Sequence, residues 1–357
     1  MTSLFIYNIV KNKDYILNIN NIELFAGAGG MALGFEKAGF KHVLLNESDK
    51  NACKTLKINR PKWKILEKNI ENIKWEDAVN SPIDLVSGGF PCQSFSHSGK
   101  RLGLEDTRGT LFYEFARCVK SVKPTCFLAE NVKGLLTHDK GNTIALIIKT
   151  FEELGYHVFK PLLLNSNNYE VAQKRERIFL FGVKKNLKKH FFFNKMPEFT
   201  PLVLKDILLP GEHYTLKLKS SLGHNYSKIK KDYFDLIPEG SNWKSLPVDL
   251  QKKYLGNMFE SGGGKTGILK RLSFNEASVT ILTSPSQKQT ERCHPIESRP
   301  LTIRETARIQ SFPDDWSFEG SIASQYKQIG NAVPVNLAKH VGLYIYYQIE
   351  KIKKLDL

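Results

Sequence analysis

The architecture follows from the stretch Glu23-Leu-Phe-Ala-Gly-Ala-Gly-Gly30, in which an apolar run leads into closely spaced glycines. Met31–Ala38 continues with apolar residues at helical spacing, so the stretch predicts a strand, a tight turn and a helix. Glycines let a ligand approach the backbone, and a helix N-terminus favours electron-rich groups. Glu47 follows the next predicted strand, where nucleotide-binding folds hold ribose hydroxyls. This indicates an adenosine-containing cofactor, although the glycine spacing is not G-x-G-x-x-G and a turn without a ligand is the alternative.

The same alternation of apolar runs and helical patterns continues to about residue 185 and predicts an α/β fold with a mostly parallel sheet. From there to about residue 298 the periodicity weakens among proline, glycine and basic residues, which indicates a smaller, loop-rich region. Helical patterns return near the C-terminus. The predicted strands are Ile22–Ala26, Val43–Asn46, Asp84–Ser87, Cys126–Glu130, Val158–Leu164 and Arg177–Gly182, and the predicted helices are Met31–Ala38, Lys50–Asn59, Leu111–Val122, Thr143–Leu154, Thr302–Ile309 and Val335–Lys353.

The 357-residue chain carries 52 Lys and Arg against 36 Asp and Glu, a net charge of +16. This excess favours a polyanionic partner, most simply nucleic acid, but its spread along the chain leaves a generally basic surface as the alternative. Because no apolar run approaches the ~18 residues of a bilayer span, we expect no membrane partner. The five cysteines form no C-x-x-C pair, which argues against a disulfide framework or a structural metal site and favours a cytoplasmic location.

A second motif, Gly88-Gly-Phe-Pro-Cys-Gln-Ser-Phe-Ser96, places Cys92 in a turn directly after a predicted strand. Open α/β sheets bind ligands at the carboxyl ends of their strands, where a thiol can be exposed and its pKa lowered. Cys92 is therefore a candidate nucleophile, with an inert buried cysteine as the alternative. The residues that follow it, Arg108 among them, have the composition of a lid over a phosphate-bearing substrate.

Two further motifs lie beside predicted strands. Glu130-Asn-Val132 ends a strand, and next to a nucleophile its carboxylate can serve as a general acid or hydrogen-bond partner. Gln173-Lys-Arg-Glu-Arg177 leads into another strand. Taken alone, the first is equally compatible with a solvated carboxylate and the second with a charged turn.

These four motifs are followed by Arg299-Pro-Leu-Thr-Ile-Arg-Glu-Thr-Ala-Arg-Ile-Gln-Ser-Phe-Pro313 and Gln328-Ile-Gly-Asn-Ala-Val-Pro334. In this order they resemble the cytosine-5 DNA methyltransferase family of the bacterial restriction–modification type. The resemblance covers nearly all of the chain except about residues 190–298. It implies the Rossmann-like fold of S-adenosylmethionine-dependent methyltransferases, with a mostly parallel sheet and a smaller, loop-rich target-recognition domain. The implied domains are a catalytic and cofactor-binding lobe at 1–190, a target-recognition lobe with the hinge at 191–319, and a C-terminal segment at 320–357 that returns to the catalytic lobe.

The resemblance assigns the chemistry to four residues. Cys92 would attack C6 of cytosine, Glu130 would contact N3 and the exocyclic amine, and Arg177 would hold O2. Arg175 belongs to the same constellation. The adduct would turn C5, a poor nucleophile, into an enamine carbon that accepts a methyl group. A cytosine within a duplex must leave the stack to be attacked, so the mechanism implies base flipping.

The implied methyl donor is S-adenosylmethionine, which becomes S-adenosylhomocysteine, with no metal. Two positions depart from the family pattern: Ser48 replaces a bulky residue against the adenine, and Asn69 replaces an acidic residue that accepts from the adenine amine. An amide oxygen can also accept that bond. The implied cofactor residues are Phe25, Gly27, Gly29, Gly30, Glu47, Ser48, Asn69, Ile70, Pro91, Leu111, Asn331, Ala332 and Val333.

Double-stranded DNA is the implied partner, and the variable region 191–298 is the implied reader of base edges. A cognate restriction endonuclease acting on the same site is a further implied partner. For each predicted DNA contact, a solvated loop residue is the alternative. These predicted contacts are Ser94, Arg108, Arg271, Thr283, Ser286, Gln287, Lys288, Gln289 and Arg292.

Three other functions compete with this hypothesis. An RNA cytosine-5 methyltransferase of the transfer-RNA type would keep the fold and change the substrate. A catalytically inactive DNA-binding relative is disfavoured because the four implied catalytic residues occur together: Cys92, Glu130, Arg175 and Arg177. A nicotinamide oxidoreductase is disfavoured by the spacing of the glycines.

Overall fold

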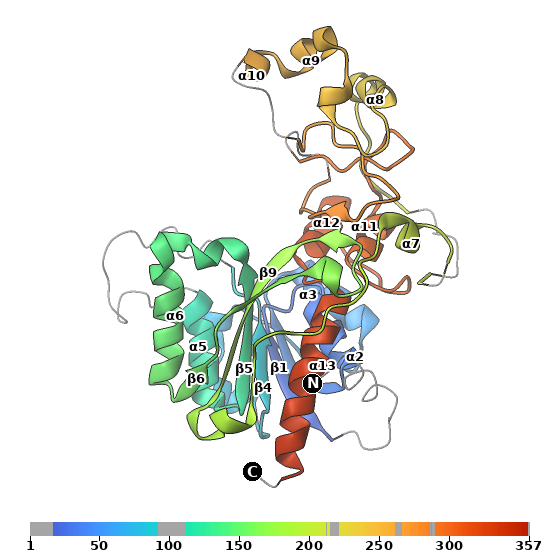
Figure 1. The fold of residues 1–357 in the computed structure, drawn as a ribbon. Helices are drawn as coiled ribbons and strands as arrows, with labels where there is room; N and C mark the ends of the chain where they lie inside the picture. Colours follow the sequence, from blue (N-terminus) through green and yellow to red (C-terminus); the bar gives the residue numbers. More distant parts are fainter. Residues whose placement is uncertain are drawn as a thin grey trace. The chain divides into compact units, whose positions relative to one another are not determined.

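A computed structural model describes residues 17–91, 111–211, 213–214, 221–260, 266–285, 287 and 290–355 (Figure 1). The chain forms two compact units. The first unit comprises Met1–Tyr169, Glu176–Phe199 and Val333–Leu357, and the second comprises Glu170–Arg175 and Thr200–Ala332.

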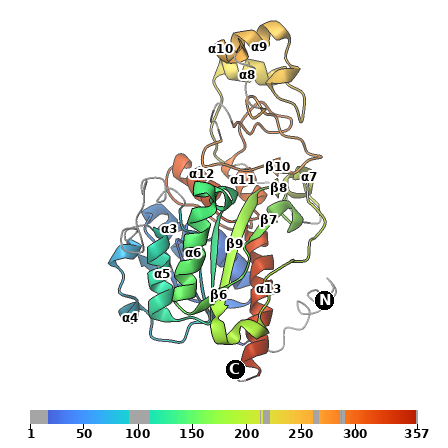
Figure 2. The same cartoon turned by 60° about the vertical axis from the view of Figure 1, so that its left-hand side comes forward.

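The first unit is built on one sheet with the strand order β3-β2-β1-β4-β5-β9-β6, and β7 also pairs with β9. Figure 2 labels β6, β7 and β9. The pairs of β1 with β2 and β4, of β2 with β3 and of β4 with β5 are parallel, whereas β9 runs antiparallel to β5, β6 and β7. The predicted mostly parallel α/β sheet is therefore confirmed. The strands are β1 (Ile19–Leu24), β2 (Phe40–Glu47), β3 (Ile65–Glu67), β4 (Leu85–Gly88), β5 (Cys126–Val132), β6 (Tyr156–Val158), β7 (Leu162–Asn165) and β9 (Glu176–Lys184).

The single strand predicted over Val158–Leu164 is wrong, because the chain forms two strands there. β6 ends at Val158 and β7 begins at Leu162, and both pair with β9. Pro161 lies between them and has no amide hydrogen to donate to the ladder. Apolar residues occur on both sides of Pro161, and for this reason the sequence pattern predicts a single strand.

Helices cover both faces of the sheet (Figure 1). α5 (Leu111–Val122) and α6 (Asn142–Glu153) lie on one face, and α2 (Gly30–Lys37) and α13 (Val335–Lys353) lie on the other. The unit also contains α3 (Lys50–Asn59) and the short α4 (Trp75–Ala78). α3 begins where Asp49 accepts hydrogen bonds from the backbone amides of Asn51 and Ala52, at 2.9 and 3.2 Å.

An aromatic cluster fills the core between the sheet and the helices α5 and α6. Phe127 of β5 stacks on Phe151 of α6 with 3.9 Å between ring centroids, and Phe115 of α5 meets both rings edge-on. Gly182 of β9 leaves room for this stack, because a Cβ there would lie 2.2 Å from the Phe127 ring. The core thus holds β5 in place, and β5 carries the E-N-V motif.

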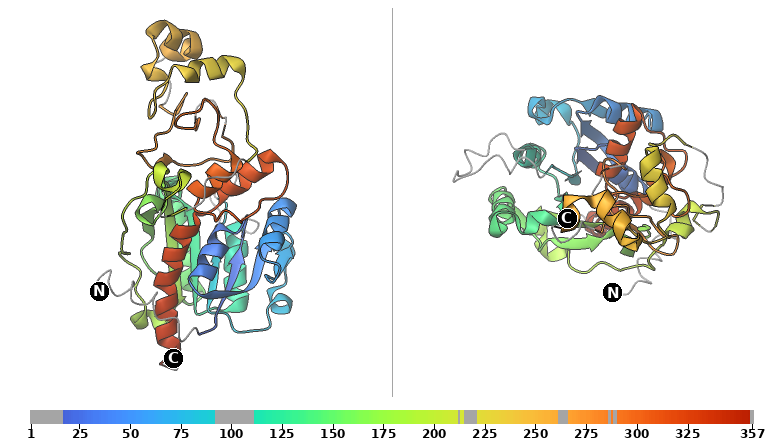
Figure 3. Two further views of the ribbon diagram at one scale, coloured as in Figure 1. Left: turned by 90° about the vertical axis from the view of Figure 1, so that its right-hand side faces the viewer. Right: turned by 90° about the horizontal axis from the view of Figure 1, so that it is seen from above.

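On the other face, α13 runs alongside α2 through small residues (Figure 3). A Cβ on Gly34 of α2 would lie 2.5 Å from the Cβ of Ala338, and a Cβ on Gly342 would lie 2.9 Å from that of Ala38. These close approaches bind the C-terminal helix to the helix that follows the glycine turn.

The second unit has little regular structure. Its two-stranded sheet pairs β8 (Gln173–Lys174) in parallel with β10 (Ser278–Val279). One apolar cluster lies around Leu204, Ile281 and Ile309, and another around Phe234 and Trp243. No helix among the described residues is long and apolar enough to cross a membrane. The helices of this unit are α7 (Leu204–Leu208), α8 (Lys228–Asp235), α9 (Val248–Leu255), α10 (Asn257–Glu260), α11 (Ile303–Ile309) and α12 (Ile322–Asn331).

Candidate active site

Two of the predicted catalytic residues, Glu130 and Arg177, meet on neighbouring strands of the first unit. The Nε atom of Arg177 on β9 lies 2.9 Å from Oε1 of Glu130 on β5. Both side chains are largely buried, with exposed fractions of 14% for Arg177 and 11% for Glu130. Burial lowers the pKa of the Arg177 guanidinium, and the neighbouring carboxylate partly offsets this effect. The pair is a preformed arrangement of opposite charges with restricted access to water.

The Glu130 carboxylate also lies against Gly89, which follows β4. β4 and β5 are parallel and pair Gly88 with Ala129, so the chain that leaves β4 passes beside Glu130. A Cβ on Gly89 would lie 2.7 Å from Oε2 of Glu130. Glycine at this position therefore leaves the space that the carboxylate occupies.

Asn131, the next residue of β5, contacts the same segment. Its Nδ2 donates a hydrogen bond of 2.9 Å to the carbonyl oxygen of Phe90. The sequence motifs contain both Gly89 and Asn131, but residue types alone did not indicate these contacts. Pro91 is exposed and is the last described residue before the segment that carries Cys92, Ser94 and Arg108, all three of which lie outside the described residues.

The glycine turn after β1 contains several residues with positive φ, a conformation that glycine adopts readily. Phe25, Gly27 and Gly29 have φ values of 56°, 54° and 85°. Oε2 of Glu47 accepts the amide of Gly27 at 2.7 Å, and its Oε1 accepts the amides of Ser48 and Asp49 at 2.7 and 2.8 Å. A Cβ on Gly27 would meet no atom within 4 Å. The turn thus has open space beside Gly27 and a fixed carboxylate next to it, features that suit a ligand with hydroxyl groups.

The other predicted cofactor residues of the first unit lie on several different elements. Asn69 and Ser48 are exposed, whereas Ile70 is buried at the start of a 3₁₀ turn, Ile70–Asn72. Arg117 of α5 holds that turn by donating to the carbonyl oxygen of Ile70 at 2.7 Å. The remaining positions are Gly30 in the first turn of α2, Leu111 at the start of α5, and Val333, which is buried just before α13.

Asn331 and Ala332 belong to the second unit, where Asn331 is the last residue of α12. Asn331 is exposed and Ala332 is buried. The carbonyl oxygen of Ala332 accepts a hydrogen bond of 3.2 Å from Nε2 of Gln310. The role of both residues toward a cofactor stays a prediction.

Glu23, the first residue of the glycine stretch, is fully buried beneath the turn. Neither oxygen of its carboxyl group makes a hydrogen bond of normal geometry among the described residues. Burial raises its pKa well above the ordinary value, and the backbone amide of Ala32 only partly opposes this effect. Burial thus favours the protonated form of the Glu23 carboxyl group over the carboxylate.

Arg175 differs from Arg177 in its surroundings. It belongs to the second unit and is 2% exposed. Its Nη1 donates to the carbonyl oxygen of Ile281 at 3.0 Å, and its Nη2 donates to that of Gly330 at 2.8 Å. Arg175 therefore links two backbone segments of the second unit through these hydrogen bonds. Its place among the catalytic residues stays a prediction.

Arg271, one of the predicted DNA contacts, is buried and makes its hydrogen bonds within the protein. It is 4% exposed, and each of its three guanidinium nitrogens donates to the protein. This arrangement favours a structural role over contact with a base. The partners are the carbonyl oxygens of Phe234 (2.6 Å), Ile237 (2.8 Å), His294 (3.0 Å) and Ile296 (2.9 Å) and the hydroxyl of Ser298 (2.8 Å).

Replacing Arg271 with methionine is expected to lower the free energy of unfolding by at least about 2 kcal/mol, because several buried carbonyl groups lose a charged donor at once. Chemical denaturation measures this loss. The control is Lys253→Met, on an exposed residue of α9, which should change stability by less than about 0.5 kcal/mol. An Arg271→Met protein with unchanged stability and relaxed sequence specificity would instead identify Arg271 as a base reader.

Arg292 is also buried, with an exposed fraction of 8%, and donates to the carbonyl oxygens of Thr280 and Glu291. Burial lowers its pKa to about 10. Thr283 and Gln287 are exposed, and Ser286, Lys288 and Gln289 lie outside the described residues. Contact of any of them with DNA stays a prediction.

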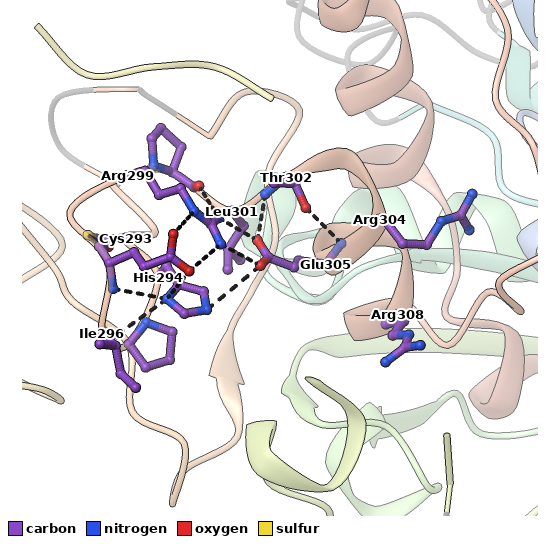
Figure 4. Close-up of polar contacts among 12 residues, drawn as sticks. Cys293, His294, Ile296, Arg299, Leu301, Thr302, Arg304, Glu305 and Arg308 are labelled. Carbon is purple, nitrogen blue, oxygen red and sulfur yellow. Dashed lines mark hydrogen bonds and ion pairs between the residues drawn. The ribbon is translucent and has the colours of Figure 1, made fainter. Parts of the chain in front are cut away.

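The first part of the Arg299–Pro313 motif forms a hydrogen-bond network around Glu305 within the second unit (Figure 4). Arg299 donates two parallel bonds of 2.8 Å to the Glu305 carboxylate. Glu305 also accepts the amide of Thr302 at 2.7 Å, while the Thr302 hydroxyl accepts the amide of Glu305, a capping box that starts α11. His294 approaches from the preceding loop, with Nε2 3.7 Å from Oε1 of Glu305. The motif therefore ties α11 to the 293–300 loop and has a structural role.

No group of three or more His, Cys, Asp or Glu side chains among the described residues is arranged to hold a metal ion. Four cysteines, Cys53, Cys118, Cys126 and Cys293, are free thiols within that part of the chain, and all are buried. Burial raises the pKa of each, to about 12 for Cys53 and Cys293. These thiols are poorly suited to act as nucleophiles.

Comparisons with known proteins agree with these features. The family model of the C-5 cytosine-specific DNA methylases matches residues 19–346. The chain is 51% identical to the type II methyltransferase M.PspPI of a Psychrobacter species over 334 residues, which cover 93% of this chain and 80% of the relative. It is 49% identical to M.Sau96I of Staphylococcus aureus over 348 residues, covering 96% and 78%. A candidate DNA modification methyltransferase from an Escherichia coli prophage has a similar structure, with a TM-score of 0.65, 25% identity, and coverage of 93% of this chain and 100% of that one.

Proposed function

The chain belongs to the family of C-5 cytosine-specific DNA methylases, and on this basis we propose that it methylates one cytosine within a particular double-stranded sequence through a covalent bond between Cys92 and C6. The activity of the family, transfer of a methyl group to cytosine C5 in DNA, is that of a transferase.

The proposed reaction begins with the thiolate of Cys92, which adds to C6 of the flipped-out base. The π electrons of the C5–C6 bond move toward C5 and N3, and the electron-rich C5 would then be able to accept a methyl group. Transfer of the C5 proton to solvent water restores the C5–C6 double bond and expels the Cys92 thiolate. Each step leaves atoms and charge in balance.

The observation that best supports this proposal is the Glu130–Arg177 pair, joined at 2.9 Å next to the backbone of Gly89. Gly89 precedes Cys92 by three residues in the sequence. A fixed carboxylate there can accept from the exocyclic amine and stabilise positive charge at N3. A guanidinium beside it can donate to O2. Because both groups are largely buried, their effect on a developing charge is stronger than in water.

The glycine turn is the proposed site for S-adenosylmethionine, which supplies, when bound, a methyl group on a positively charged sulfur. Open space beside Gly27 and the fixed carboxylate of Glu47 fit a nucleoside with ribose hydroxyls. Glu47 already accepts three backbone amides and retains lone pairs for a hydroxyl donor. Asn69 would offer its amide oxygen to the adenine amine.

The target sequence is proposed to be read within residues 191–319, most of which belong to the second unit. Segment 320–357 is proposed to complete the catalytic lobe, which the packing of Ala338 and Gly342 of α13 on α2 supports. The names of the relatives place them in type II modification. We therefore propose that this protein acts in the bacterial cytoplasm, where it protects DNA from a cognate endonuclease.

We expect the purified chain to transfer labelled methyl groups from S-adenosylmethionine to duplex DNA. Bisulfite sequencing of the product should show protection of one cytosine in one short recurring sequence. Transfer RNA, offered in parallel under the same conditions, should accept no label. Labelling of transfer RNA with none in DNA would support the RNA methyltransferase instead, and labelling of neither would support an inactive DNA-binding relative.

A further inference from the structure

We infer that Asn131 is a positioning residue that fixes the backbone in front of Cys92 relative to Glu130. This inference rests on the proposed role of Cys92 and adds a residue to that mechanism. It concerns how one strand, β5, aligns the nucleophile's segment with the group that contacts the base.

The orientation of the Asn131 amide is determined by two hydrogen bonds. Asn131 is 3% exposed, and its Oδ1 accepts the backbone amide of Val132 at 2.8 Å. Because Oδ1 is used in this way, the atom that faces Phe90 is Nδ2, and it donates to the carbonyl oxygen at 2.9 Å. The amide therefore acts as a donor toward the Phe90 backbone.

The register of the sheet explains why the two segments meet. Gly88 of β4 pairs with Ala129 of β5 in parallel. Continued past the end of β4, this register brings Gly89 beside Glu130 and Phe90 beside Asn131. Two consecutive residues of β5 thus contact two consecutive residues of the other segment, one through a close backbone approach and one through a hydrogen bond.

Phe90 is held from a second direction by its side chain. The ring is 2% exposed and packs edge-on against Phe112 and Phe115 of α5, with centroid distances of 5.6 and 6.1 Å. Its carbonyl group is held by Asn131. Phe90 is thus fixed by core packing and by a buried hydrogen bond, and Cys92 is only two residues away in the sequence.

This arrangement has a consequence for the reaction. Addition to C6 requires the thiolate and the Glu130 carboxylate to be correctly spaced on one base, and an error of about 1 Å in such geometry can cost about 100-fold in rate. Because Glu130 and Asn131 are neighbours on a buried strand, a single rigid element sets that spacing. A purely structural role for Asn131 would affect stability and leave the rate of the folded enzyme unchanged.

The sharpest test is Asn131→Asp, which keeps the shape of the side chain and the acceptor for Val132. It replaces the donor by an oxygen that faces the carbonyl oxygen of Phe90. We expect kcat, counted per S-adenosylmethionine-binding site, to fall about 10- to 100-fold, with the KM for S-adenosylmethionine unchanged within about twofold. The rate of covalent capture by a target duplex carrying 5-fluorocytosine should fall by the same factor. Lowering the pH should narrow the difference from wild type, because a protonated aspartic acid can donate again.

Asn21→Asp is the matched control. Asn21 is fully buried in β1 and its side chain also makes a buried hydrogen bond, but its partner is the Ser87 hydroxyl inside β4, at 3.1 Å, and not the backbone of Phe90. This variant should lose stability and keep the kcat of the wild type per binding site. If Asn131→Asp does not fold, Asn131→Ala removes the donor without adding charge and should show the same separation of kcat from KM.

Capture by a folded Asn131→Asp protein at the wild-type rate would overturn the inference. So would an equal loss of kcat in Asn21→Asp, since the effect would then follow from burial alone. A wild-type chain that methylates no DNA and forms no adduct would instead overturn the proposed function, so the two failures can be distinguished.

Discussion

Replacement of Cys92 with alanine is expected to lower methyl transfer by at least about 10⁴-fold, the largest effect we predict for a single substitution. The physical reason is that C5 of cytosine becomes nucleophilic only after a thiolate has added to C6. No hydrogen bond or charge in the site can replace that covalent step. Incorporation of labelled methyl groups into target DNA measures the loss.

The Cys92→Ala protein should still bind S-adenosylmethionine, because the glycine turn and Glu47 are formed by other segments. The matched control is Cys118→Ala, on a buried cysteine of α5 whose pKa is raised by burial. That variant is expected to lose some stability and to keep its activity. Substantial methyl transfer by Cys92→Ala would exclude a covalent mechanism through this residue.

Glu130→Gln is expected to lower kcat by about 100- to 1,000-fold, the second largest effect. Glutamine has the same size and can still accept from the exocyclic amine of cytosine, but it carries no charge to stabilise a proton or positive charge at N3. It also leaves Arg177, which is largely buried, without its carboxylate partner. Single-turnover methylation separates this effect from DNA binding.

The control for Glu130→Gln is Glu176→Gln. Glu176 lies beside Arg177 in the sequence, and its carboxylate forms an exposed ion pair with Lys133, with 3.0 Å between Oε2 and Nζ. Such pairs contribute little, so this variant should keep kcat within about twofold. Equal activity of Glu130→Gln and the wild type would show that the carboxylate does not support the adduct.

The fold was predictable where local pattern and tertiary structure agree. α3 and α5 have the predicted bounds, and β1, β2 and β4 lie within a few residues of theirs. β3 spans only three residues and is too short to show a periodicity, yet it pairs with β2 at the edge of the sheet. α8 and α9 lie in a region of mixed charge, and their buried apolar residues, Phe234 and Leu255, belong to the cluster around Phe234 and Trp243. Such elements depend on tertiary contacts that a window of sequence does not contain.

The candidate site was predictable in composition and less so in geometry. The motifs indicated Glu130 and Arg177, which contact each other, and Glu47, which contacts the glycine turn. Arg175 and Arg177 are two residues apart in sequence, but their guanidinium groups have different partners, because the boundary between the two units falls between Arg175 and Glu176. The roles of Gly89 and Asn131 depend on the register of β4 and β5, which no residue type specifies.

The bond between Cys92 and C6 of the target cytosine is the central step of the proposed mechanism. The direct measurement is mass spectrometry of the protein after incubation with S-adenosylmethionine and a target duplex in which 5-fluorocytosine replaces the methylated base. Fluorine at C5 cannot leave as a proton does, so the adduct should persist. We predict a stable protein–DNA complex whose cross-linked peptide contains Cys92, and no complex with Cys92→Ala. A duplex that is methylated in its normal form but gives no complex when fluorinated, or one attached through another residue, would contradict the account.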